Sequence, residues 1–104
     1  MKFMVTFQMQ GEKANAALRD RNFGEKMQQL LNDFHAESVY FSTINGERGC
    51  HMVLNLDDPS MIPKIAEPLF FWLGAKVNFY PVMTPEDLQK ATGYIKDSAD
   101  KWSD

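Results

Sequence analysis

The spacing of apolar residues changes along this chain in a definite order. They alternate with other residues over 3–9, 47–56 and 77–83, the period of a strand with one buried face. Residues 37–44, rich in β-branched and aromatic types, predict a further strand. Over 23–34 and 62–73 the apolar residues recur every three or four positions, the period of one helix face. The order strand, helix, strand, strand, helix, strand predicts a ferredoxin-like α+β fold, with two helices on one face of a four-stranded antiparallel sheet.

Residues that favour turns separate these elements. Asn45-Gly46 predicts a tight hairpin, because both residue types tolerate positive φ. Asn22 and Gly24 lower helix propensity, so we expect a break near 21–24 within the first helical region. Pro81 cannot donate to a ladder, which places the last strand at a sheet edge.

The end of the chain has a start signal for a short third helix. Thr84-Pro85-Glu86-Asp87 combines an N-cap with acidic residues in the first turn, and Gly93 is the expected stop. After it the chain is polar apart from Ala99 and Trp102, which predicts a frayed tail unless Trp102 docks on another surface. With 104 residues in all, we predict a single domain over 1–94 and a polar tail over 95–104.

Composition excludes several classes of function. The net charge of −3 argues against nucleic acid as a partner. Cys50 is the only cysteine, so neither a disulfide nor a Cys/His metal cluster is expected, and a reducing compartment fits best. The longest apolar stretch, 69–75, is far shorter than the roughly 20 residues that cross a bilayer. We therefore expect a cytoplasmic chain with no metal, cofactor or membrane partner.

The alternation leaves the predicted sheet with a second, open face. Its expected members are Met4, Thr6, Gln8, Tyr40, Ser42, Ile44, His51, Val53, Asn55, Asn78, Tyr80 and Val82. This set is too apolar for plain solvated surface and too polar for a second core. We expect a homodimer that stacks two such faces and encloses a cavity between them.

Two short segments, together with the order of elements, carry a family resemblance. They are the Asp57-Asp58-Pro59 step into the second helix and the segment 77–84. Over about residues 1–92 the chain resembles the dimeric α+β barrel superfamily, and within it a family of functionally uncharacterised bacterial proteins of similar length. Members of that superfamily include cofactor-independent monooxygenases acting on aromatic compounds, muconolactone isomerases and haem-binding enzymes. Residues 23–34 show no haem-ligand pattern, so the resemblance implies a cofactor-free protein that binds a small apolar or aromatic metabolite.

Five residues of the open face are the candidate ligand-binding residues. His51 is the best candidate for a general base or a hydrogen-bond donor in a pocket, although no acidic partner is assigned to it and a structural role is open. Tyr40 and Tyr80 would frame an aromatic ligand or be buried in the dimer interface. Gln8 and Asn78 would orient a polar group or bond across the dimer.

Other conspicuous residues have simpler explanations. Either Asp58 or Ser60 is expected to cap the following helix, so Asp57 and Asp58 do not indicate a metal site. Arg19 is expected to lie on the surface, and Cys50 to be a buried, inert thiol. The aromatic run 70–72 is wider than one helix stripe, so one of its rings should face a pocket or a partner.

Two functions are compatible with these observations. The first is small-molecule binding, as a binding protein or a cofactor-independent monooxygenase or isomerase. The second is a dimeric module without catalysis, whose open face serves only self-association. The sequence does not decide between them.

Overall fold

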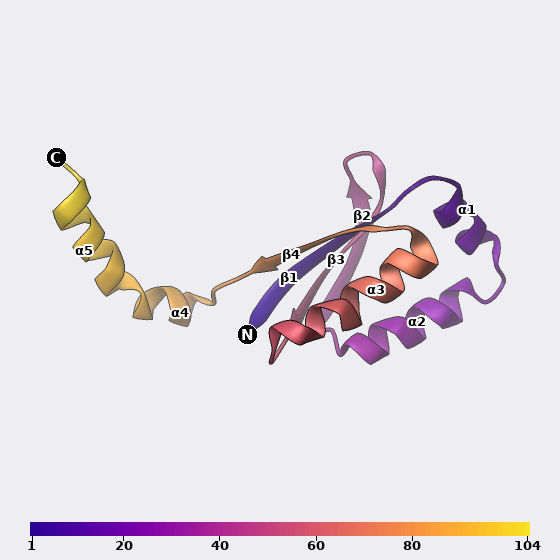
Figure 1. Cartoon of the computed structure of the whole chain (residues 1–104), viewed down its shortest axis with the longest axis horizontal. Helices are drawn as coiled ribbons and strands as arrows, with labels where there is room; N and C mark the ends of the chain where they lie inside the picture. The colour runs from indigo at the N-terminus through magenta and orange to yellow at the C-terminus, as the bar shows by residue number, and fades with distance from the viewer.

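The structure, a computed structural model, describes residues 1–104 and consists of a sheet, a helical layer and a C-terminal extension (Figure 1). The four strands are β1 (Lys2–Met9), β2 (Ser38–Ile44), β3 (Glu47–Asn55) and β4 (Lys76–Pro81). The helices are α1 (Gly11–Arg19), α2 (Phe23–Phe34), the 3-10 turn η1 (Pro59–Met61), α3 (Ile62–Leu73), α4 (Pro85–Lys90) and α5 (Thr92–Trp102).

The sheet has the strand order β2-β3-β1-β4, and every neighbouring pair is antiparallel. The connection from β1 to β2 therefore passes over β3, and the connection from β3 to β4 passes over β1. This is the split βαβ arrangement, and it confirms the predicted ferredoxin-like α+β fold. The edge position of β4 confirms the expectation drawn from Pro81.

The core lies between the sheet and its helices, α2 and α3, which run side by side over one face (Figure 1). The strand residues buried there are those that the alternation assigns to the helix side. They are Val5, Phe7 and Met9 from β1, and Cys50, Met52 and Leu54 from β3. Helix α3 contributes a stripe spaced as a helix face requires, Ile65, Leu69 and Leu73. Phe3 and Arg48 also lie on the helix side, and the other side chains of the two central strands point to the opposite face.

The turns follow the expected residues. Asn45 and Gly46 both have positive φ, 52° and 80°, as a two-residue hairpin of the twisted sheet needs. Gly74 ends α3 in the left-handed region. The predicted break in the first helical region is also confirmed, because α1 ends at Arg19 and α2 begins at Phe23.

The predicted frayed tail is wrong. Thr84 and Asp87 form a reciprocal capping box that starts α4, and α5 then continues through Gly93 to Trp102. The backbone N–H of Tyr94 donates to the carbonyl of Ala91, so the two helices follow each other almost without interruption. Gly93 acts as a stop only in the left-handed region, and here it is not among the residues with positive φ.

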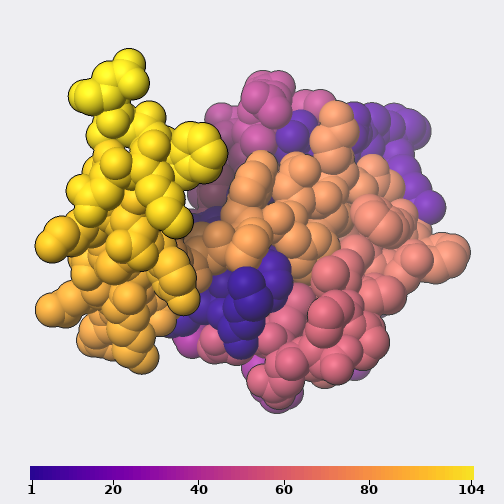
Figure 2. All heavy atoms as spheres, turned by 60° about the vertical axis from the view of Figure 1, so that its left-hand side comes forward, coloured from indigo at the N-terminus to yellow at the C-terminus, as the bar shows by residue number.

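The last helices project from the rest of the molecule. We call α4 and α5, residues 85–102, the C-terminal arm; it extends from the end of β4 at one end of the long axis (Figures 1 and 2). The chain measures 59 × 27 × 22 Å, and its radius of gyration is 17.5 Å, against about 13 Å for a compact domain of this length. None of the helices has the length and apolar composition that crossing a membrane requires.

Candidate functional site

A single row of side chains crosses the open face at the middle of all four strands. Tyr40 of β2 is paired with His51 of β3, His51 with Thr6 of β1, and Thr6 with Asn78 of β4. Directly opposite residues in an antiparallel sheet have their Cβ atoms about 5 Å apart on one face. A phenol, an imidazole, a hydroxyl and a carboxamide therefore stand side by side. We call these four residues the polar row.

A second row, largely apolar, lies next to it. Met4 of β1 is paired with Val53 of β3 and with Tyr80 of β4. Met4 and Val53 are half-buried, whereas Tyr80 is exposed. The two rows together give the centre of the open face one half that can donate and accept hydrogen bonds and one half that is apolar.

Gln8 lies on the other side of the polar row and is closed off from solvent. It is only 5% exposed, and its Oε1 accepts a hydrogen bond of 3.2 Å from Nδ2 of Asn45 in the hairpin. The structure thus brings four of the five candidate residues onto accessible positions of one face. Gln8 is instead tied to the turn, where its side chain supports the end of the sheet.

His51 has no acidic neighbour in the sheet. The residues opposite it are Thr6 and Tyr40. The chain has no group of three or more His, Cys, Asp or Glu side chains that could hold a metal ion, at His51 or elsewhere. A base oriented by a carboxylate, as in a hydrolytic triad, is therefore not formed here. The row can bind a polar group, and His51 is its only imidazole.

The remaining candidates occupy structural positions. Hydrogen bonds from Ser60, first from its side chain and then from its backbone N–H at 2.8 Å, lower the pKa of the Asp58 carboxyl. Arg19 pairs with Glu12 at 2.6 Å on the surface. Cys50 is fully buried, and desolvation raises the pKa of its thiol to about 12. These positions agree with the cap, the surface cation and the inert thiol expected from the sequence.

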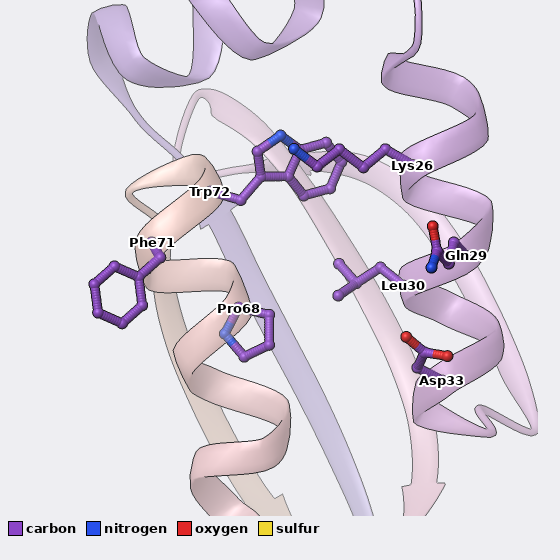
Figure 3. A pocket seen from close by; sticks show the side chains of 7 residues that line it. All are labelled: Lys26, Gln29, Leu30, Asp33, Pro68, Phe71 and Trp72. Carbon is purple, nitrogen blue, oxygen red and sulfur yellow. The ribbon is translucent and has the colours of Figure 1, made fainter.

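A further depression lies on the outer side of the helices, and the sequence predicted only that one ring of residues 70–72 faces a pocket or a partner. A groove of about 540 Å³ between α2 and α3 is lined by Lys26, Gln29, Leu30, Asp33, Pro68, Phe71 and Trp72 (Figure 3). Trp72 and Leu30 point into the space between the helices, whereas Phe71 points away from it (Figure 3).

Trp72 is held by two contacts. Its ring lies 5.3 Å from the ring of Phe23, and Nζ of Lys26 stands 5.2 Å from its centroid. The signal in the sequence was the aromatic run 70–72, which was too wide for one helix stripe. The position of Trp72 in the groove depends on how α2 packs beside α3, which the spacing of residues within one helix does not predict.

Comparison with known proteins adds a family. The sequence profile of a domain of unknown function, DUF3303, matches residues 1–94. The chain belongs to the DUF3303 family. No curated protein matches this DUF3303 chain. Among solved structures, it is similar to the de novo designed protein Ferredog-Diesel, with 10% sequence identity, 78% of this chain and 85% of that chain covered, and a TM-score of 0.43. The DUF3303 match confirms the expected resemblance to an uncharacterised family.

Proposed function

We propose that this DUF3303 protein forms a homodimer through the open face of its sheet and binds a small apolar or aromatic metabolite in the cavity enclosed between the two faces. The observation that carries the proposal is the juxtaposition of the polar row with the apolar row of Met4, Val53 and Tyr80. A ligand site typically combines an apolar lining with a few polar groups that fix orientation.

The exposure of this face supports an interface. Tyr40 is 69% exposed and Tyr80 is 52% exposed, on the open side of a sheet whose opposite side carries the core. Large aromatic side chains are enriched at protein interfaces, where they bury much area at a small entropic cost. Covering the face with a second copy would bury both rings and place two polar rows opposite each other.

The polar row suits binding and, at most, proton transfer. His51 and the hydroxyl of Tyr40 would orient a ligand carbonyl or phenol, and Asn78 would hold a second polar group. In an isomerase or a cofactor-independent oxygenase, His51 would accept the proton that an acidic ligand loses. The alternative is a module without catalysis whose face serves only self-association; in that case the same row would form hydrogen bonds across the dimer.

The dimer is tested by sedimentation at micromolar concentration. We expect a species of twice the chain mass of 12.0 kDa. A single species at the mass of one chain over the whole concentration range would contradict the dimer and the enclosed cavity together.

Ligand binding is tested by titrating the protein with hydroxylated aromatic acids and quinones while following backbone amide chemical shifts by NMR. We expect shifts to concentrate at residues 6, 51 and 78, and to be reduced in His51→Ala and Asn78→Ala. Thr43→Ala is the matched control, because Thr43 is exposed on β2 but lies on the other face. Shifts confined to the groove around Trp72 would place the ligand elsewhere. A dimer that binds none of these compounds would favour the non-catalytic module.

A further inference from the structure

The C-terminal arm carries an apolar stripe that nothing in its own chain covers. In α5, Ile95, Ala99 and Trp102 fall at i, i+4 and i+7, on one side of the helix. Ile95 is 55% exposed and Trp102 is 84% exposed. Neither α4 nor α5 has a single buried residue. The opposite side of α5 is charged, with Asp97 and Lys101, so the arm is amphipathic and lacks a partner.

The arm helices are too short to be stable without packing. They have 6 and 11 residues, and isolated helices below about 12–15 residues are marginal in water. Gly93 within α5 lowers the helix propensity further. Packing of the arm against a surface outside this single chain would supply the stability that the two short helices lack.

The total surface of the chain leads to the same conclusion. The chain exposes 7357 Å², whereas a compact folded protein of its mass exposes about 6,000 Å². The excess of about 1,400 Å² is of the size that one partner contributes to an extensive, obligate interface. The accessible surface area of the chain is that expected for one subunit of an oligomer and is larger than that expected for a monomer of its mass.

Strand β2 is the surface in the fold that most needs a cover. Its sequence, SVYFSTI, contains no charged residue and no proline, and it forms one edge of the sheet. An uncharged, exposed edge strand invites pairing with other chains unless it is covered. Tyr40 and Phe41 both project from it, and Phe41 is 57% exposed although it lies on the helix side of the sheet. The other edge strand, β4, is protected by Lys76 and Pro81.

We propose that the arm is exchanged between two copies of the chain, so that α4 and α5 of one copy pack their apolar stripe over strand β2 of the other. This inference rests on the homodimer proposed above. Within one chain, β2 and the start of the arm lie at opposite edges of the sheet, and the arm points away from the body (Figure 1). In a stack of two open sheets related by a two-fold axis parallel to the strands, β4 of one copy faces β2 of the other, so an arm that turns back from the end of β4 lies along β2 of the facing copy.

The dimensions fit this arrangement. As helices, α4 spans about 9 Å and α5 about 17 Å, and the seven residues of β2 span about 23 Å as strand. A docked arm adds its own apolar stripe and strand β2 to the contact that the open face makes.

The first experiment follows the environment of Trp102. In Trp72→Phe, which keeps an aromatic ring against Phe23, Trp102 is the only tryptophan. We expect its fluorescence emission to shift to shorter wavelength as the protein concentration rises through the dimerisation range. A blue-shifted emission that does not depend on concentration would mean that the arm folds onto its own chain, and an emission typical of exposed tryptophan at every concentration would mean that it packs on nothing. Either result overturns the proposal.

The second experiment measures the dimer dissociation constant of full-length variants. We expect the double substitution Ile95→Gln, Trp102→Gln to weaken dimerisation at least about tenfold, and Phe41→Ser to weaken it as well. The matched control Asp97→Gln, Lys101→Gln changes the polar side of the same helix without changing net charge and should have little effect. A dimer unaffected by the stripe variant or by Phe41→Ser contradicts arm exchange but leaves the sheet-face dimer intact. A wild-type protein that stays monomeric contradicts both.

Discussion

The side chain of Ile44 lies directly over Gly49, so that a Cβ added to Gly49 would stand 2.5 Å from Cγ1 of Ile44. Both residues face the open side of the sheet beside the hairpin, where Gly49 is paired with Ser42 and Gln8. Ile44 thereby closes the end of the open face, and the accessible part of that face begins at the polar row. Glycine is needed at position 49 for space, not for an unusual backbone angle, since its φ is not positive.

Gly49→Ala should therefore destabilise the protein. The new methyl group must displace Ile44, and overpacking of this kind costs about 1–3 kcal/mol. The matched control is Gly24→Ala in α2, where an added Cβ meets nothing within 4 Å and alanine has the better helix propensity, so that variant should be stabilised by about 0.5–1 kcal/mol. Urea denaturation of the two variants measures both changes. Equal free energies of unfolding would contradict the role assigned to Gly49.

The capping box at the start of the arm predicts a pH dependence. The backbone N–H of Thr84 donates to the carboxylate of Asp87 at 3.0 Å, and Thr84 Oγ1 accepts from the N–H of Asp87 at 3.1 Å. Hydrogen bonds to Thr84, the backbone one first, lower the pKa of Asp87 below 3.8. Because the pKa of Asp87 is lower in the folded protein than in the unfolded chain, its carboxylate stabilises the fold at pH values above the unfolded-state pKa. This stabilisation is lost as the pH falls through the folded-state pKa.

An NMR titration of the Asp87 side chain should thus give a midpoint below that of an unstructured aspartate. Thr84→Ala removes the hydroxyl but leaves the backbone donor, so the midpoint should rise without reaching the ordinary value, and the helical content of residues 85–90 should fall. A midpoint that Thr84→Ala leaves unchanged would show that the box does not hold the carboxylate.

Cys50 should be protected from thiol reagents in the folded protein. Burial in the core raises the pKa of its thiol from 9.0 to about 12, and only the thiolate reacts. Because a raised acid pKa stabilises the protonated, folded form, its contribution is full below pH 9.0 and is lost as the pH rises toward 12. We expect modification by an aromatic disulfide at neutral pH to be as slow as unfolding and to become fast in urea. Rapid labelling without denaturant would mean that β3 opens locally.

The sequence was sufficient to predict the sheet and its two faces, because alternation in a strand assigns every side chain once the pairing is known. The hairpin at Asn45-Gly46 fixes the register of β2 against β3 locally, and for that reason Tyr40 lies opposite His51. The pairing of Thr6 with Asn78 depends on β1 lying beside β4, a contact between distant parts of the chain that follows from the order of elements. The sequence therefore predicts which residues belong to the polar row, whereas which of them lie next to each other across the sheet is known only from the structure.

Gln8 and the tail differ from what their local sequence indicates, and the physical causes are of the same kind. Gln8 has the period of an open-face residue, but the burial that removes it from the site comes from the hairpin folding back, with Asn45 bonded to its side chain. The tail has low helix propensity around Gly93, yet residues 92–102 are helical. Propensity describes an isolated segment, whereas the proposed packing on a second copy would supply the stability that the segment lacks.

The test of His51 compares it with its neighbour on the same strand. His51 is half-buried on the open face, and Met52, the next residue of β3, is fully buried on the core face, so the comparison separates the effects of the two environments. Met52→Ala should cost about 2–5 kcal/mol, because it opens a cavity in a close-packed core. His51→Ala should cost less than about 2 kcal/mol in the monomeric protein at low concentration, and it should weaken ligand binding in the NMR titration. If the free energy of unfolding of His51→Ala falls as far as that of Met52→Ala, the imidazole is part of the packing of the sheet and the polar row is not a binding site.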